Sequence, residues 1–283
     1  MPNAEPELLL DGLLFPEGPR WHEERLWFSD MHAHEVVAVD LAGNRETIVE
    51  VPNQPSGLGW LPDGRMLVVS MTDRKLLRLD PEGLVEVASL GDLASFHCND
   101  MVVDSHGRAY VGNFGSDIYE SQERQDANLV MVTPGGEARI VASGLMFPNG
   151  TVVTPDGGTL IVAESMGRRL TAFDVQDDGS LSNRRVWAEL DVPPDGICLD
   201  AENCVWVAAP GNPGSFVRVA QGGEVQDRIT LEHRGGFACA LGGPERRTLF
   251  LLEAFASNPA RIRDRSNGQI RKVEVAAPGA GWP

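Results

Sequence analysis

The sequence predicts an all-β fold, a six-bladed β-propeller whose four-stranded antiparallel blades surround a central channel. Short apolar runs of strand length recur along the chain, and no segment keeps the 3.6-residue apolar period of a helix. Tight turns such as Asp63-Gly64 separate the runs, and Asp-Gly turns favour hairpins. The pattern returns six times at intervals of roughly 39 to 49 residues, which is typical of propeller blades.

The first three units share one order, an opening motif followed by strand-like runs. The motifs and runs are 16–21, 25–30 and 35–40 in unit one, 55–60, 65–70 and 75–80 in unit two, and 99–100, 108–112 and 129–132 in unit three. The segment from Phe114 to Asn128 is polar and interrupts unit three. We therefore expect it to be a surface excursion of that blade.

Units four to six repeat the order, and the chain ends then close the ring. Their motifs and runs are 148–150, 159–163 and 170–174 in unit four, 194–196 and 204–208 in unit five, and 236–238 and 248–252 in unit six. An open ring would expose unpaired strand edges. We expect 269–275 to be a late strand of blade six and 8–10 to pair with it as the outermost strand. The whole chain, residues 1–283, is therefore expected to form a single propeller domain.

Composition and charge restrict the function. With 42 % hydrophobic residues the chain can build a full core. The net charge of −17 argues against nucleic acid, which requires clustered Lys and Arg, and against anionic membranes. No apolar stretch approaches the roughly 20 residues of a membrane span, and Met1–Leu10 lacks the basic start of a signal peptide. The four cysteines have no CxxC spacing, so we expect reduced thiols in a cytoplasmic protein.

An oxygen-bearing side chain occupies the same position at the start of four units, namely Glu17, Asn99, Asn149 and Asp195. Residues that open the inner strands of a propeller lie near one mouth of the channel, so these side chains are expected to converge on the axis. Two carboxylates and two amides suit one divalent cation, with Ca²⁺ first and Mg²⁺, Mn²⁺ or Zn²⁺ as alternatives. The competing interpretation is that these residues only form turns, which Asn-Gly and Asp-Gly commonly do.

The same motifs resemble those of the senescence-marker protein/gluconolactonase/luciferin-regenerating family of six-bladed propellers. The matching segments are 15–21, 97–101, 147–150, 194–197 and 279–283. The resemblance implies that Glu17, Asn149 and Asp195 hold a divalent cation on the axis. It further implies that Asn99 contacts the substrate or completes the metal shell. Sugar-lactone hydrolases of the family often carry Arg two residues before this Asn, where this chain has His97.

The expected function is metal-dependent hydrolysis of a lactone. A bound cation polarises a carbonyl and activates water, and a nearby carboxylate takes the proton of that water. Asp195 is the first candidate for this base, and Asp100 is the second, either as a base or as an acceptor that orients Asn99. His97 is expected to be either a donor or auxiliary base in the substrate pocket or a structural loop residue. A serine hydrolase is disfavoured because no GxSxG motif occurs.

Three other functions stay open. The same site could act on another electrophile, such as an organophosphate or another ester or carbonyl compound, because a fold does not choose its substrate. A non-catalytic propeller that binds calcium or another ligand would hold the cation without turnover. A protein-interaction propeller is less favoured, because it has no need of convergent acids. As a hydrolase the protein would have a small-molecule partner, and the sequence leaves the oligomeric state open.

Overall fold

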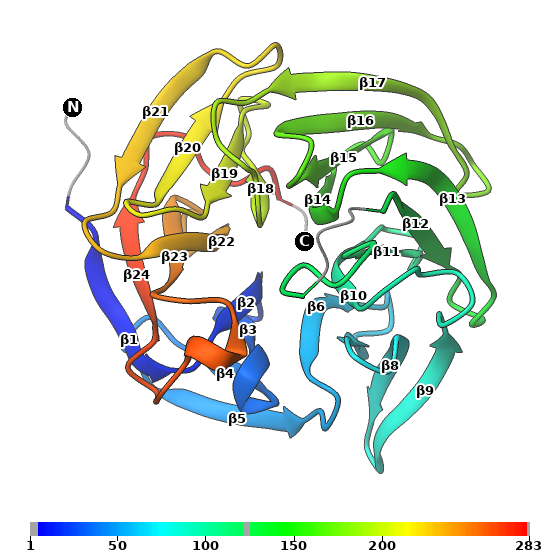
Figure 1. The fold of residues 1–283 in the computed structure, drawn as a ribbon, viewed down its shortest axis with the longest axis horizontal. Helices are drawn as coiled ribbons and strands as arrows, with labels where there is room; N and C mark the ends of the chain where they lie inside the picture. The colour runs from blue at the N-terminus through cyan, green and yellow to red at the C-terminus, as the bar shows by residue number, and fades with distance from the viewer. Residues whose placement is uncertain (1–4, 121–124, 282–283) are drawn as a thin grey trace.

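The computed structural model describes residues 5–120 and 125–281. Six four-stranded sheets stand in a ring around a channel, so the predicted fold is confirmed (Figure 1). The described ranges contain only two helices, the short 3-10 helices η1 (Met31–Ala33) and η2 (Pro259–Arg261). Neither has the length or the apolar character needed to cross a bilayer. Parts of the predicted excursion 114–128 and of the matching C-terminal segment 279–283 lie outside the described residues.

The first five blades each take four consecutive strands, from the inner strand at the channel to the outer one. Blade one is β2 (Pro16–His22), β3 (Arg25–Asp30), β4 (Glu35–Val39) and β5 (Arg45–Glu50), and blade two is β6 (Pro55–Trp60), β7 (Met66–Ser70), β8 (Lys75–Asp80) and β9 (Gly83–Ser89). Blade three is β10 (Cys98–Val103), β11 (Ala109–Asn113), β12 (Ala127–Val132) and β13 (Ala138–Leu145), and blade four is β14 (Pro148–Val153), β15 (Thr159–Glu164), β16 (Arg169–Val175) and β17 (Leu181–Glu189). Blade five is β18 (Ile197–Leu199), β19 (Val205–Ala209), β20 (Ser215–Val219) and β21 (Val225–Thr230).

Blade six joins the two ends of the chain. Its strands are β22 (Gly235–Gly242), β23 (Thr248–Ala254), β24 (Gly268–Glu274) and, outermost, β1 (Glu7–Leu13). The N-terminal strand runs antiparallel to β24, with Leu8 opposite Arg271 and Leu10 opposite Ile270. The predicted closure of the ring by the two chain ends is therefore confirmed.

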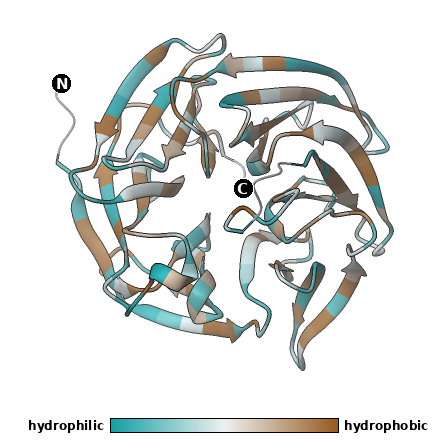
Figure 2. Ribbon diagram, viewed as in Figure 1, coloured by the Kyte–Doolittle hydropathy of each residue, from teal (hydrophilic) through white to brown (hydrophobic). Residues whose placement is uncertain are grey.

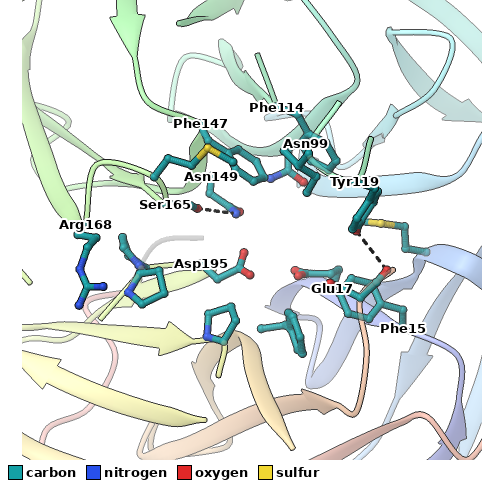
Figure 3. Close-up of a pocket in the computed structure, with 18 residues that line it drawn as sticks. Phe15, Glu17, Asn99, Phe114, Tyr119, Phe147, Asn149, Ser165, Arg168 and Asp195 are labelled. Atoms are coloured by element: carbon teal, nitrogen blue, oxygen red, sulfur yellow. Dashed lines mark hydrogen bonds between the residues drawn. The ribbon is translucent and has the colours of Figure 1, made fainter. Parts of the chain in front are cut away.

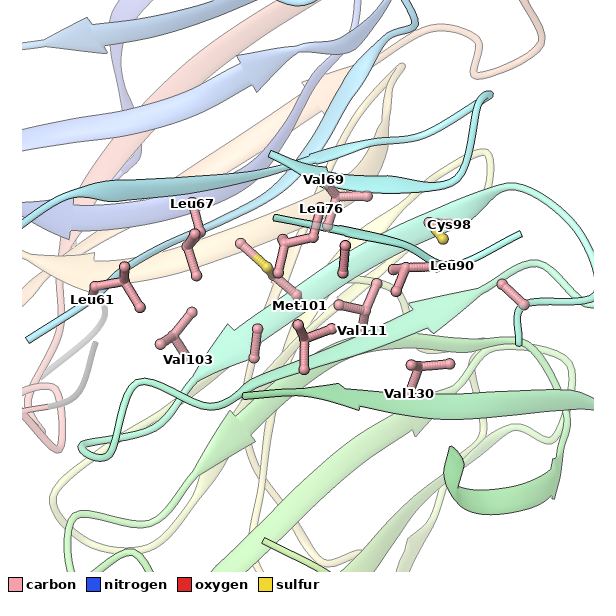
Figure 4. Packing of buried hydrophobic residues seen from close by; sticks show 14 residues of the cluster. Leu61, Leu67, Val69, Leu76, Leu90, Cys98, Met101, Val103, Val111 and Val130 are labelled. Carbon is pink, nitrogen blue, oxygen red and sulfur yellow. The ribbon is translucent and has the colours of Figure 1, made fainter. Parts of the chain in front are cut away.

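The core lies between neighbouring blades, and hydrophobic residues are accordingly spread over all six of them (Figure 2). Figure 4 shows the cluster between blades two and three. There Val69 of β7 faces Met101 and Val103 of β10, and all three side chains are buried. Met101 and Val103 point to the same face of the sheet because they are two residues apart in one strand. Each blade is thus stabilised by the next one around the ring.

Glycines in the opening motifs allow adjacent inner strands to touch near the axis. A Cβ atom on Gly57 would lie 2.3 Å from the backbone nitrogen of Met101, and one on Gly150 would lie 2.5 Å from that of Ile197. Only glycine fits so close an approach of two backbones. Gly57 and Gly150 lie inside β6 and β14, so their motifs are parts of strands and not turns. The interpretation of the recurring motifs as simple turn formers is therefore wrong for these blades.

Candidate active site

A cavity of about 400 Å³ opens where the inner strands begin. The second residues of β2, β10 and β14 line it, namely Glu17, Asn99 and Asn149. Asp195, just before β18, lines it as well. The structure thus brings all four predicted cation ligands to one cavity. Figure 3 shows the carboxylates of Glu17 and Asp195 pointing toward each other across it.

A β-bulge at the start of the inner strand accompanies the turn of these side chains toward the axis in blades one, three and four. In blade four the pairing with β15 is regular at Pro148 and resumes only at Thr151, which leaves Asn149 in the irregular stretch. The inner strands of blades one and three show the same shift, after Glu17 and after Cys98. A bulge re-aims a side chain that regular pleating would direct between two blades.

Two carboxylates at the ends of second strands hold the loops that lead into the site. Asp30 is buried, and its Oδ1 accepts a hydrogen bond from the backbone nitrogen of Phe15 at 2.7 Å. Glu164 is also buried, and its Oε2 accepts from the backbone nitrogen of Met146 at 2.8 Å. An ion pair of 2.9 Å with Arg169 compensates its charge. Nothing in the motif pattern singles out Asp30, because its role depends on a backbone contact.

Hydroxyl groups orient the two amides of the site. Asn149 Nδ2 donates to Ser165 Oγ at 3.1 Å, which leaves Asn149 Oδ1 available as an oxygen ligand. Asn99 Oδ1 accepts from Ser56 Oγ at 3.3 Å and keeps a second lone pair. Ser29 Oγ donates in turn to the carbonyl oxygen of Ser56 at 2.6 Å. In blade two, Ser56 occupies the position that bears a predicted ligand in blades one, three, four and five. Blade two therefore contributes to the site by orienting the Asn99 amide.

Burial and neighbouring negative charge raise the affinity of both cavity carboxylates for a proton or a cation. Burial, followed by the negative charge of Asp195, raises the pKa of Glu17 well above its usual value. Burial raises the pKa of Asp195 to about 8; a hydrogen bond from the Asn149 side chain opposes this shift, and the charge of Asp100 adds to it. In the described ranges neither Glu17 nor Asp195 forms a salt bridge. Two carboxylates in this position are stabilised by a proton or by a cation.

The donor set fits a hard divalent cation. Ca²⁺ binds six to eight oxygens from carboxylates, amides and water, and this site offers the first two kinds from Glu17, Asp195, Asn99 and Asn149. Two carboxylates also balance a charge of +2. Over the described residues, no group of three or more His, Cys, Asp or Glu side chains suited to a metal ion occurs. The four predicted cation ligands are not a group of that kind, because two of them, Asn99 and Asn149, are amides.

The structure does not bring Asp100 or His97 to the wall of the cavity. Asp100 is buried and pairs with Arg20 Nη2 at 2.9 Å, so its charge is already engaged. The imidazole of His97 stacks on Phe96 with ring centroids 4.1 Å apart. It also meets the edge of Phe114, which does line the cavity, with centroids 6.2 Å apart. Of the two interpretations of His97, the geometry favours the structural one.

The segment predicted as a surface excursion partly covers the cavity, and that prediction is wrong for its first residues. Phe114, Ile118 and Tyr119 all line the cavity. Phe114 and Ile118 pack in an apolar cluster with other wall residues, which draws the segment inward. Tyr119 Oη donates to the carbonyl oxygen of Ser257 at 3.1 Å and so joins the segment to a loop of blade six. The apolar residues Phe114 and Ile118 within this polar segment were the sequence signal that could have predicted its contact with the cavity.

Two further wall residues, Phe237 and Arg168, were not among the predicted site residues, although Phe237 lies in the opening motif of unit six. Phe237 occupies the blade-six counterpart of the ligand position, in a bulge between Gly236 and Ala238. The position that bears oxygen on the other five blades therefore bears an aromatic ring on the sixth. Arg168 follows β15 and lies at the rim of the cavity, where its side chain is exposed.

Comparison with known proteins decides the family. The sequence profile described as "SMP-30/Gluconolactonase/LRE-like region" matches residues 15–255, which is most of the chain. The chain belongs to the SMP-30/gluconolactonase/LRE-like family. The matched range includes all four predicted cation ligands of this family member. The resemblance seen in the opening motifs is thereby confirmed.

The SMP-30-family relatives have diverse names and low identity to this chain. A 6-deoxy-6-sulfogluconolactonase of Pseudomonas putida is 24 % identical, over 94 % of this chain and 93 % of that protein. A diisopropyl-fluorophosphatase of Loligo vulgaris is 26 % identical, over 86 % and 84 %. The solved structure of a calcium-binding protein, regucalcin, from Agrobacterium tumefaciens superposes with a TM-score of 0.82 at 21 % identity, covering 99 % of this chain and 97 % of that one. This structural likeness shows the shared fold.

Proposed function

We propose that the protein is a divalent-cation-dependent hydrolase that opens lactones, with Ca²⁺ as the cation. The supporting observation is the pair of carboxylates, Glu17 and Asp195, that face each other across one cavity, with no cationic side chain of residues 5–120 or 125–281 between them. The amides of Asn99 and Asn149 line the same cavity and supply neutral oxygens. The relatives named as a sulfogluconolactonase and a diisopropyl-fluorophosphatase favour hydrolysis at an ester-like centre.

Five polar residues of the cavity have a defined task in the proposed reaction. Glu17, Asn99, Asn149 and Asp195 hold the cation, and Ser165 fixes the orientation of Asn149. When bound, the cation supplies Lewis-acid polarisation of the substrate carbonyl and lowers the pKa of adjacent water. The apolar walls lower the local polarity beside the ligand oxygens, which strengthens electrostatic interactions there.

Asp195 is the proposed general base, because its carboxylate opens on the cavity while that of Asp100 is engaged by Arg20. The carboxylate accepts a proton from the attacking water as the water oxygen bonds to the carbonyl carbon. The ring C–O bond then breaks, and Asp195 returns the proton to the departing alkoxide. The product is a hydroxy acid, and no redox partner is required.

The test replaces the proposed base and compares it with a remote carboxylate. We expect Asp195→Asn and Asp195→Ala to lower lactone hydrolysis by about 100-fold or more, the usual contribution of a positioned base. The same variants should weaken Ca²⁺ binding measured by titration calorimetry. Asp156→Asn, in an exposed hairpin turn of blade four, is the matched control and should retain both properties. Unchanged hydrolysis in both Asp195 variants would end the proposal.

The identity of the cation is tested separately. Treatment with a chelator should abolish hydrolysis, and Ca²⁺, Mg²⁺, Mn²⁺ and Zn²⁺ are then restored one at a time. We expect Ca²⁺ to restore the highest activity, because carboxylates and amides are the oxygen ligands it prefers. Full activity after exhaustive chelation would contradict cation dependence.

A second candidate is hydrolysis of a phosphorus ester at the same site. The observation that favours it is the 26 % identity to the diisopropyl-fluorophosphatase of Loligo vulgaris. A panel of lactones, carboxylic esters and organophosphates, assayed with the same enzyme preparation, distinguishes the two. Tight Ca²⁺ binding with no turnover on any member of the panel would favour the non-catalytic alternative.

A further inference from the structure

The walls around the predicted cation ligands are dominated by aromatic and thioether side chains. They include Phe15, Phe114, Phe147, Phe237, Met31 and Met166. The ring centroids of Phe114 and Phe147 lie 4.7 Å apart, and those of Phe15 and Phe237 lie 4.9 Å apart. These residues form one apolar cluster, so the cavity is a continuous apolar surface interrupted by the ligand oxygens.

Phe147 is held in a conformation that its sequence does not favour. Its φ angle is 61°, in the left-handed region that bulky residues rarely adopt. The neighbouring backbone is fixed on both sides, by Glu164 Oε2 at the nitrogen of Met146 and by the nitrogen of Ser165 at the carbonyl oxygen of Phe147. Such conformations persist where the surrounding structure over-determines them, and they cluster at ligand sites. Here the conformation places an aromatic ring in the cavity wall.

Few polar side chains remain for a substrate once the predicted cation ligands are set aside. They are Tyr119, Ser165, Arg168 and Ser257. The hydroxyl of Tyr119 already donates to the backbone of Ser257, and that of Ser165 accepts from Asn149. A polyhydroxylated lactone would therefore place most of its hydroxyl groups against phenylalanine and methionine. Polar groups buried without partners oppose binding.

Arg168 is the only cationic side chain that lines the described cavity. Its guanidinium donates to the backbone carbonyl of Asp191, and across the described residues it forms no salt bridge with a carboxylate. Figure 3 shows it beyond Asp195, on the side away from Glu17. A divalent cation would neutralise the two carboxylates, so Arg168 would leave the loaded cavity with a net charge of +1. An anionic group at that end of a substrate would be favoured.

We propose that the substrate is a lactone or ester with an apolar, ring-sized body and an anionic group on the end remote from the reacting carbonyl. The body packs on the phenylalanine and methionine walls, the carbonyl lies at the cation ligands, and the anion pairs with Arg168. This inference rests on the hydrolase function proposed above. It differs from that proposal in excluding sugar lactones as the preferred class.

The first experiment compares two δ-lactones on the Ca²⁺-loaded enzyme. We expect kcat/KM for a benzo-fused δ-lactone to exceed that for glucono-δ-lactone by about 100-fold, because the apolar walls offer the sugar hydroxyls few partners. A higher kcat/KM for the sugar lactone would overturn the inference and leave the hydrolase proposal intact. Absence of hydrolysis of every lactone and ester would overturn the hydrolase proposal itself, and the inference with it.

The second experiment tests the role of Arg168. Arg168→Gln should lower kcat/KM by about fivefold for a carboxylated benzo-fused lactone, the effect expected from one solvent-exposed ion pair. The kcat/KM for the neutral parent lactone should fall by a smaller factor, because that lactone has no anion to pair with Arg168. Arg139→Gln, on the outer strand of blade three, is the control for loss of one exposed positive charge. Equal effects of Arg168→Gln on both lactones would overturn the anion-binding role.

Binding of unreactive ligands provides a readout independent of turnover. Titration calorimetry with 3-phenylpropionate should show saturable binding that weakens in Arg168→Gln, whereas gluconate should not bind detectably. Phe147→Ala should weaken 3-phenylpropionate binding while leaving Ca²⁺ affinity unchanged, since Phe147 is a wall residue and not a predicted cation ligand. Gluconate binding as tight as that of 3-phenylpropionate would contradict the apolar assignment.

Discussion

The hydroxyl of Ser165 is a hydrogen-bond partner of the Asn149 amide at the wall of the cavity. Ser165 Oγ accepts the hydrogen bond of Asn149 Nδ2, so the amide oxygen is the end that remains for a cation. Groups that orient a metal ligand commonly matter almost as much as the ligand itself. Ser165 is therefore a positioning residue in the proposed site, although it does not belong to the recurring motif.

Replacing Ser165 by Ala should lower Ca²⁺ affinity by about tenfold, because the amide of Asn149 then loses the hydroxyl that helps to orient it. Titration calorimetry measures this, and the melting temperature of the cation-free protein should stay unchanged. Ser182→Ala, at an exposed position of β17 in the same blade, is the control. Equal Ca²⁺ affinity in all three proteins would contradict the positioning role.

The two carboxylates predict how pH acts on the cation-free protein. The pKa of Asp195 rises from 3.8 to about 8 in the fold, and that of Glu17 is raised as well. The folded state then holds more protons than the unfolded state between these pH values, so its stability decreases as pH rises through that window. We expect the melting temperature to fall from pH 4 to pH 8 in chelator. Saturating Ca²⁺ should remove much of this fall, and a chelated protein that becomes more stable toward pH 8 would contradict the assignment.

Sequence reasoning found the ligand positions because each recurs at the start of a repeat. Glu17, Asn99, Asn149 and Asp195 share one register, and the propeller geometry converts that register into proximity. Part of the apolar wall follows the same register, since Phe15 and Phe147 each lie two residues before a ligand, but another part does not. Residues such as Tyr119 reach the cavity through loops that have no repeat period, and their positions depend on long-range contacts such as the bond to Ser257.

At the scale of elements, the last residue of the second strand supports the loop that enters the inner strand of the same blade in blades one and four. Glu164, the last residue of β15, binds the backbone of Met146, the charge of Arg169 and the hydroxyl of Thr171. Sequence reasoning could place Glu164 at a strand end. It could not assign these three partners, because two of them lie on other elements.

Glu164→Gln should destabilise the protein by about 2 kcal/mol, because hydrogen bonds to a buried charged group are among the stronger ones. Urea unfolding measures this in the presence and absence of Ca²⁺. Asp174→Asn is the matched control, since it breaks an exposed ion pair with Arg185 in the same blade and should change stability little. If the two variants were equally stable, Glu164 would not anchor the loop.

At the scale of the whole molecule, the ring closes through the pairing of its two chain ends. β1 covers the outer edge of β24, and Leu13 packs with Phe28 and Ile270 in the core between blades six and one. This closure was predictable because a circular sheet arrangement leaves one place where the first and last strands must meet. The exact strand ends were not, because two register shifts interrupt the pairing of β1 with β24.

Leu13→Ala should destabilise the protein by about 3 kcal/mol, since it empties a fully buried site. Leu8 lies on the same strand but is exposed, so Leu8→Ala should have little effect and serves as the control. Urea unfolding compares the two variants. Similar stability of both would show that the closing strand does not hold the ring together.

The propeller is built from six similar blades, but the residues around the cavity differ from blade to blade. Glutamate, serine, two asparagines and aspartate occupy one position on five blades, and Phe237 occupies it on the sixth. Arg168 lies on the side of Asp195 opposite Glu17. A substrate held at the cation ligands, at Phe237 and at Arg168 would present only one face of its carbonyl to the base. The proposed enzyme should therefore be enantioselective, and a racemic chiral lactone would be resolved during its hydrolysis.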